Sequence, residues 1–214
     1  MSPPDLIAPS NAVAVIGAGP GGLACAAYLL RHGLEPVLFE AAADVGGQWN
    51  GAAPGSATWS GMRANTSRVM TAFSDLDHPE EAPTYPTRED MFAYLRRYAA
   101  LTGVGSRARF RTRVEEIDRA PGGWRVRSAG AQGARSEIFA RVVVATGRHT
   151  VPKAPAIPRL DRFLGRLGVS HAGAYDGEAR FRGARVLVAG CSISALEIAS
   201  ALAYGGAKRV FLSR

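Results

Sequence analysis

The chain has 214 residues, a formal net charge of +8 and an apolar fraction of 47%, which suits one large globular domain or two small ones. Only two of its 26 basic residues are lysines, so a general arginine-rich usage explains the charge and we expect no nucleic-acid partner. Its two cysteines form no Cys-x-x-Cys pair, which argues against dithiol redox chemistry and favours a cytoplasmic location.

The first predicted element is an apolar strand at 12–16, which runs into a glycine-rich turn and a helix over 20–32. Gly17 permits a tight turn, Gly19 lets a pyrophosphate approach the backbone, and Gly22 lets the helix pack closely on the strand. The helix N-terminus offers free N–H groups and partial positive charge to phosphates. The predicted dinucleotide-binding residues of this turn are Gly17, Gly19, Gly21 and Gly22.

A second strand at 36–39 ends in Glu40, at the distance from the turn where a ribose-binding carboxylate is expected. Glycines and a proline interrupt the apolar stretch 12–30, so we expect a strand, turn and helix there and no membrane contact. The glycine pair before Trp49 indicates a loop whose backbone approaches the rest of the cofactor. The alternative is a loop with a packed tryptophan.

The region 51–85 contains few periodic segments, and Asn65 taken alone is typical of a turn or cap. Thr87 is the predicted N-cap of a helix that ends near Gly103, because Asp90 stands at its third position.

Strands are then predicted at 108–117, 124–128 and 136–144, separated by glycine-rich turns. They form an antiparallel meander over about 107–141, whose last strand returns to the first sheet and ends in Thr146-Gly147. Period-two alternation places four arginines on one solvated face of the first of these strands, namely Arg107, Arg109, Arg111 and Arg113. The first eleven residues are expected to be a loose lead-in.

After a connector at 151–184 the opening pattern recurs, with strands at 185–189 and 208–212 around a helix at 196–204. The turn between them begins at Gly190, and small residues replace the later glycines. We therefore expect domains at 1–150 and 185–214, the second being the first βαβ part of a dinucleotide-binding domain.

The second repeat ends in Ser213-Arg214, where the first has Glu40. A guanidinium binds a ribose 2′-phosphate, whereas a carboxylate accepts from a ribose hydroxyl. The first site therefore suits an unphosphorylated dinucleotide and the second suits NADP. Two such sites in one chain imply a flavin–nicotinamide oxidoreductase.

From residue 13 to residue 214 the chain resembles the flavin-containing monooxygenases, which are related to the Baeyer–Villiger monooxygenases. The motifs that carry this resemblance are the 17–22 turn, Glu40, 46–49, 63–66, 145–147, Phe163-Leu-Gly165, 171–175 and 190–195. The resemblance implies an α/β fold, with an FAD-binding Rossmann-like domain and the start of an NADP-binding one. It implies no metal.

The resemblance also implies FAD on the first repeat, NADPH on the second, and a C4a-hydroperoxyflavin formed with O2 that oxygenates a small-molecule nitrogen, sulfur or ketone. Asn65 aligns with the family's asparagine near the flavin and is the predicted catalytic residue. The further residues predicted to bind cofactor are Gly47, Gln48, Trp49, Thr66, Thr146, Gly147, Gly190, Ser192, Ser194, Ala195, Ser213 and Arg214.

The chain departs from the family pattern in two respects. Five residues, instead of three, separate Gly165 from His171, and the chain is shorter than is usual in the family. Two alternatives therefore stay open. One is a two-dinucleotide reductase that passes electrons to another acceptor, and the other is a truncated, non-catalytic dinucleotide-binding subunit. A homo-oligomer or a complementing chain is the expected protein partner.

Overall fold

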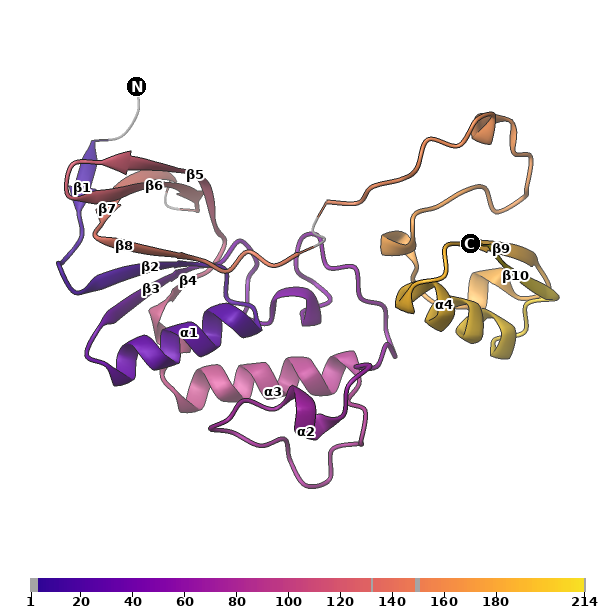
Figure 1. The fold of residues 1–214 in the computed structure, drawn as a ribbon, viewed down its shortest axis with the longest axis horizontal. Coiled ribbons are helices and arrows are strands. Elements are labelled where there is room, and N and C mark those ends of the chain that lie inside the picture. The colour runs from indigo at the N-terminus through magenta and orange to yellow at the C-terminus, as the bar shows by residue number, and fades with distance from the viewer. Residues whose placement is uncertain (1–3, 132, 149–150, 214) are drawn as a thin grey trace. The chain divides into compact units, whose positions relative to one another are not determined.

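The structure is a computed structural model that describes residues 4–131, 133–148 and 151–213. It divides into two compact units, residues 1–150 and residues 151–214, and each contains a parallel sheet entered through a glycine-rich turn (Figure 1). None of the helices in these described ranges is long and apolar enough to cross a membrane.

A four-stranded parallel sheet with the order β4-β3-β2-β8 forms the centre of the first unit. Its strands are β2 (Ala12–Ile16), β3 (Glu35–Phe39), β4 (Ala108–Arg109) and β8 (Arg141–Val144). Helix α1 (Pro20–Arg31) joins β2 to β3, and helix α3 (Arg88–Leu101) lies beside α1 (Figure 1). The predicted strand, helix and strand are confirmed.

A second sheet, with the order β1-β7-β6-β5, contains the predicted antiparallel meander. Its strands are β1 (Asp5–Ile7), β5 (Thr112–Ala120), β6 (Gly123–Gly130) and β7 (Gly133–Phe139). The expected loose lead-in is wrong for its described part, because β1 pairs in parallel with β7. The Asp5 carboxylate anchors it by accepting hydrogen bonds from Arg125 and Ser136.

The two faces of the parallel sheet are covered by different elements. Alternate residues of β2, such as Val13 and Val15, pack with α1 and α3 in one apolar core. On the other face Phe39 meets Phe139 of the meander edge-on, with ring centroids 6.0 Å apart. All five residues of β2 are buried for this reason.

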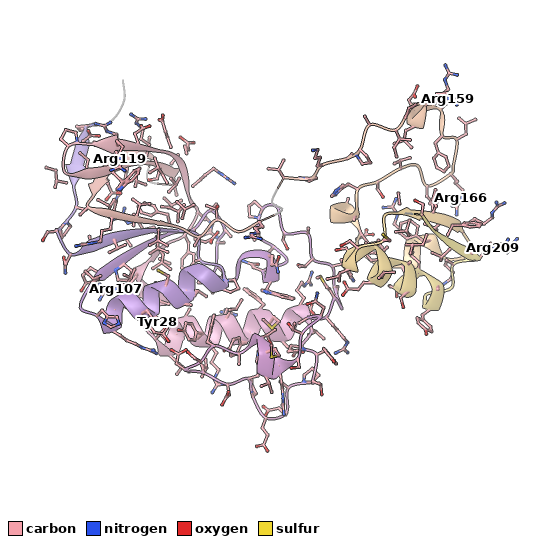
Figure 2. The ribbon with its side chains drawn as sticks, in the orientation of Figure 1. Tyr28, Arg107, Arg119, Arg159, Arg166 and Arg209 are labelled. Carbon is pink, nitrogen blue, oxygen red and sulfur yellow. The ribbon has the colours of Figure 1, made fainter. Side chains whose placement is uncertain are left out.

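Two predicted strands are each divided between the two sheets. The strand expected at 108–117 breaks at Arg111, whose φ of 50° turns the chain from β4 into β5. The expected single face of arginines is therefore wrong, and two of them have carboxylate partners: Arg107, which is labelled in Figure 2, binds Glu35, and Arg109 binds Glu137. The strand expected at 136–144 is likewise β7 and β8, separated by one residue.

The N-terminus of α3 has the predicted cap. Thr87 Oγ1 accepts from the Asp90 N–H at 3.1 Å, and the Asp90 carboxylate accepts from the Thr87 N–H at 2.9 Å. This reciprocal pair satisfies two backbone donors that the helix cannot satisfy itself. Between β3 and α3 the described chain is mostly irregular, with a short helix α2 (Arg68–Thr71).

In the second unit β9 (Arg185–Ala189) and β10 (Arg209–Ser213) pair in parallel, and α4 (Ile193–Tyr204) connects them. Helix α4 begins three residues earlier than expected because the turn after β9 is short. The chain from 151 to 184 contains only short 3-10 turns, at Leu160–Arg162, Ala172–Ala174 and Ala179–Phe181.

Candidate functional site

The glycine-rich turn of the first unit is fixed by its neighbours on both sides. The Gly17 N–H donates to the Phe39 carbonyl at 2.8 Å, which continues the pairing of β2 with β3. Gly17 has a φ of +104°, and a Cβ there would lie 2.6 Å from the Ala145 carbonyl oxygen. Only glycine fits, so the turn lies directly against the end of β8.

Gly22 allows α1 to begin where it does. A Cβ on Gly22 would lie 1.9 Å from the Gly17 carbonyl oxygen, so the helix packs closely on the turn that follows β2. A Cβ on Gly21 would meet nothing within 4 Å. Gly19 is the N-cap of α1, no side chain caps it, and Pro20 follows. The first turn of α1 therefore leaves backbone donors for an anion.

The loop after Glu40 contacts the backbone of this turn. The Gly46 N–H donates to the Ala18 carbonyl at 2.9 Å, and a Cβ on Gly47 would lie 2.9 Å from the Gly19 Cα. Gly47 itself has a φ of +55°. The close neighbour of Gly19 in the structure is thus the Gly47 backbone, and the predicted approach of a pyrophosphate to Gly19 stays a prediction.

Glu40 joins the turn to the following loop through its carboxylate. One oxygen accepts from the Ala18 N–H at 2.8 Å and the other from the Ala42 N–H at 2.7 Å. The residue is 9% exposed. Each carboxylate oxygen has a further lone pair, so these bonds leave acceptor capacity for the predicted ribose contact.

Gln48 and Trp49 form a 3-10 turn with Gly47. The Trp49 side chain is 9% exposed and belongs to the core beneath α1 and α3, as the packed-tryptophan alternative states. Gln48 is exposed, and its carbonyl accepts from the hydroxyls of Ser56 and Thr58 at 2.8 and 2.9 Å. We therefore expect contacts with a cofactor to come from Gln48 and from backbone, with the indole as support.

Thr146 and Gly147 follow β8 and are exposed. The Ala145 N–H donates to the Ile16 carbonyl at 2.9 Å, which holds this segment beside the glycine turn. The structure thus brings together three predicted loops at the carboxyl ends of β2, β3 and β8. Ligands of open α/β sheets bind at this edge.

The fourth predicted segment, Asn65 and Thr66, is an exposed bend on the chain between β3 and α3. Among the described residues, no hydrogen bond joins it to the glycine turn or to Glu40. The residue before it, Ala64, is 5% exposed and packs in the same core as Trp49. The catalytic role of Asn65 stays a prediction.

The turn of the second unit repeats the geometry of the first. The Gly190 N–H donates to the Ser213 carbonyl at 3.0 Å, and Gly190 has a φ of +113°. Ser192 is the N-cap of α4, and both Ser192 and Ser194 are exposed. Ser213 is therefore equivalent to Phe39, and in sequence Arg214 follows Ser213 as Glu40 follows Phe39. Arg214 itself lies outside the described residues.

A Cβ built on Gly190 would lie 3.9 Å from the Ala195 Cβ. An alanine therefore stands in the second unit at the position that Gly22 has in the first. His171, the histidine of the altered spacing, accepts the Gly173 N–H on its Nδ1 at 3.0 Å and caps a 3-10 turn. Its observed role is structural.

Sequence reasoning did not identify the buried polar cluster that holds the segment after Asn65. The Tyr94 hydroxyl accepts from the Phe73 N–H at 2.7 Å and donates to the Leu76 carbonyl at 2.6 Å. His78 is 8% exposed and stacks on Tyr94 with centroids 3.9 Å apart. Its Nε2 lies 3.2 Å from Thr71 Oγ1, while Nδ1 is buried without a partner among the described residues.

This cluster predicts that stability falls in mild acid. Burial, and next the charge of Arg68, lower the pKa of His78 below its ordinary value of 6.5, although Asp77 and Asp90 oppose this. The folded state then binds fewer protons than the unfolded chain. The contribution of His78 is complete above pH 6.5 and is lost as the pH falls through the lowered pKa.

We expect the midpoint of urea unfolding to decrease between pH 7.5 and pH 5 more in the parent chain than in His78→Phe, which keeps the stacking but cannot titrate. The difference between the two variants isolates His78 from the carboxylates that titrate in both. Equal decreases would contradict the prediction.

Comparison with known proteins agrees with this geometry. The family model for flavin-binding monooxygenase-like proteins matches residues 10–214. Flavin-containing monooxygenase 5 of Rattus norvegicus is 33% identical over 212 residues, and indole-3-pyruvate monooxygenase YUCCA1 of Oryza sativa subsp. japonica is 34% identical over 197. The aligned regions cover 94% and 91% of this chain but 39% and 45% of those relatives, so the chain spans less than half their length.

Among solved structures, S-allyl-L-cysteine S-oxygenase from Allium sativum is similar with a TM-score of 0.85 and 28% identity, covering 95% of this chain and 51% of that one. Tmm from Pelagibacter sp. strain HTCC7211 follows with a TM-score of 0.84 and 27% identity, covering 94% and 50%. The sequence match, the shared fold and the two glycine turns agree, and the chain belongs to the flavin-binding monooxygenase-like family.

Proposed function

We propose that the chain is the FAD- and NADPH-binding part of a flavin monooxygenase that oxygenates a nitrogen or sulfur centre, or a ketone, of a small molecule. The observation that carries the proposal is the repeated turn, in which the first glycine N–H binds the carbonyl that ends the neighbouring strand. In the first unit the next residue is an acid and in the second it is an arginine. One chain thus offers two dinucleotide sites of different charge.

The residues of the first unit fit FAD. The α1 N-terminus has no side-chain cap and open space at Gly21, which leaves room and donors for a pyrophosphate. Glu40 lies at the end of β3, where its free lone pairs would accept from a ribose. Thr146-Gly147 and the backbone of 46–48 line the same edge. When bound, the flavin would supply the activation of O2.

The second unit fits NADPH in the same way. The exposed Ser192 and Ser194 offer hydroxyls beside the α4 N-terminus, and Ala195 is small enough for close approach. Arg214 follows Ser213 directly in the sequence, and its guanidinium would bind the 2′-phosphate. Asn65, exposed and carrying an amide, would donate a hydrogen bond near the reacting flavin atoms.

The name of one similar structure, an S-oxygenase, favours sulfur as the centre that is oxygenated. A small-molecule substrate, O2 and either a second copy or a complementing chain complete the proposal. A cytoplasmic location is part of it, because the two cysteines are free in the structure and unpaired in sequence pattern.

The first test is the visible spectrum of the purified chain after incubation with FAD and removal of free flavin. We expect oxidised-flavin bands that bleach under anaerobic NADPH and bleach more slowly under NADH. The matched variant Arg214→Ala should keep the flavin and lose the preference for NADPH by about tenfold or more, since a charged hydrogen bond is removed. A colourless chain that takes up no FAD would contradict the proposal.

A further inference from the structure

The Asn65 bend is held by a ladder of hydrogen bonds between two short segments, which we call the clasp. The clasp consists of residues 62–68 and 84–88, and the bend lies between its anchoring bonds. Those bonds run from Ala64 N–H to Pro86 O (2.8 Å), from Arg68 N–H to Thr84 O (2.7 Å) and from Arg88 N–H to Met62 O (2.7 Å). Asn65, Thr66 and Ser67 therefore project as a bulge whose two ends are fixed.

The Arg68 side chain provides a second anchor at one end of this bulge. Its Nη1 carries two N–H groups and lies within hydrogen-bond distance of three carbonyl oxygens of a single tight turn, residues 79–82, so one N–H is shared between two of them. The Ala82 N–H closes this turn onto Pro79 O at 3.0 Å. The acceptors are Pro79 O at 3.1 Å, Ala82 O at 2.8 Å, and Glu80 O. One guanidinium group thus binds three backbone carbonyl groups and fixes the distance between α2 and this turn.

The turn at 79–82 is itself anchored to the core. The residue before it, His78, is buried against Tyr94, and Tyr94 holds the backbone of Phe73 and Leu76 with its hydroxyl. A continuous series of contacts therefore runs from α3 through the 73–82 segment to Arg68. Arg68 is the link between that series and the Asn65 bulge.

We propose that Arg68 is a positioning residue that holds Asn65 in the place where the flavin reaction needs it. This inference rests on the proposed function. Arg68 acts through the clasp and the 79–82 turn and does not itself touch the reacting atoms. Without its guanidinium, three carbonyls lose their common donor and the bulge keeps only the backbone ladder.

The geometry supplies discriminating variants. Because a single nitrogen makes all three bonds, the ammonium of lysine, with three hydrogens, can replace it. Methionine keeps much of the length but offers no donor. Arg63 lies in the same clasp and donates to one carbonyl, that of Tyr85 at 3.0 Å, so Arg63→Met is the matched control.

The first arm of the test is amide hydrogen exchange on the full chain, which requires no activity. We expect Arg68→Met to speed exchange of the backbone amides at positions 64 and 68 by about tenfold or more. Exchange in Arg68→Lys and Arg63→Met should stay close to that of the parent. Unchanged exchange in Arg68→Met would overturn the proposal. So would equal acceleration in Arg68→Lys. Thermal unfolding of each variant identifies any that does not fold.

The second arm measures how much NADPH oxidation yields oxygenated product and how much yields hydrogen peroxide. Arg68→Met should bind FAD as the parent does but release more peroxide, and Asn65→Ala is expected to do the same. The double variant should be no worse than Asn65→Ala. Additive losses would overturn the link to Asn65. A parent chain that binds no flavin contradicts the proposed function instead, and the exchange arm still decides whether Arg68 holds the bulge.

Discussion

Gly22→Ala is expected to lower the free energy of unfolding of the first unit by about 3 kcal/mol or more and to abolish FAD retention. The added Cβ would lie 1.9 Å from the Gly17 carbonyl oxygen, where no side chain is tolerated. Helix α1 must therefore move away from β2, and both the core beneath it and the N–H groups at its start move with it. Urea unfolding and bound-flavin absorbance measure the two effects.

Gly21→Ala is the matched control for this variant. It lies in the same first turn of α1, and its Cβ would meet nothing within 4 Å. Alanine is the better helix former by about 1 kcal/mol, so this variant should be as stable as the parent or slightly more stable. The second unit carries Ala195 at the position equivalent to Gly22. If Gly22→Ala proves as stable as Gly21→Ala, α1 can shift outward at little cost and the steric argument fails.

Glu40→Leu is expected to destabilise the first unit by about 2–5 kcal/mol, because two buried backbone donors lose their acceptors together. These are the N–H groups of Ala18 and Ala42, one in the glycine turn and one in the loop behind it. The substitution fills the same space with apolar atoms, so loss of packing does not contribute. Loss of FAD affinity should accompany the loss of stability, since the turn and the loop are no longer joined.

Glu40→Gln separates the two contributions. Its amide oxygen can still accept from one N–H, while its amide nitrogen faces the other donor. We expect roughly half the loss of stability seen in Glu40→Leu, measured by urea unfolding of the chain without flavin. A Glu40→Leu chain as stable as the parent would show that water satisfies both donors.

Local signals made the first repeat predictable. The apolar strand, the glycine spacing and the acid after the second strand each follow from short-range sterics and hydrogen bonding, and the capping box of Thr87 and Asp90 is equally local. The breaks at Arg111 and Ala140 were not predictable in this way. Both stretches have unbroken strand character in sequence, and the choice of sheet depends on pairing with distant β3 and β2.

The same limit applies to the site. The sequence locates the glycine turns and Glu40, because their spacing reports backbone geometry directly. It cannot show that Trp49 packs inward or that Arg68 binds a turn eleven to fourteen residues away. The one signal in the sequence is an arginine three positions after Asn65. Its partners are backbone carbonyl groups, and since every residue has one, the sequence does not identify which residues the arginine binds.

The described chain passes between the two sheets of the first unit at three places, with four residues separating β1 from β2, two separating β4 from β5 and one separating β7 from β8. Neither sheet can separate from the other without stretching these short connections. The meander and the parallel sheet are therefore expected to unfold together, and a partly unfolded form in which only one sheet is intact is disfavoured. Calorimetry of the full chain should accordingly show the two sheets of the first unit melting together, in a single cooperative transition.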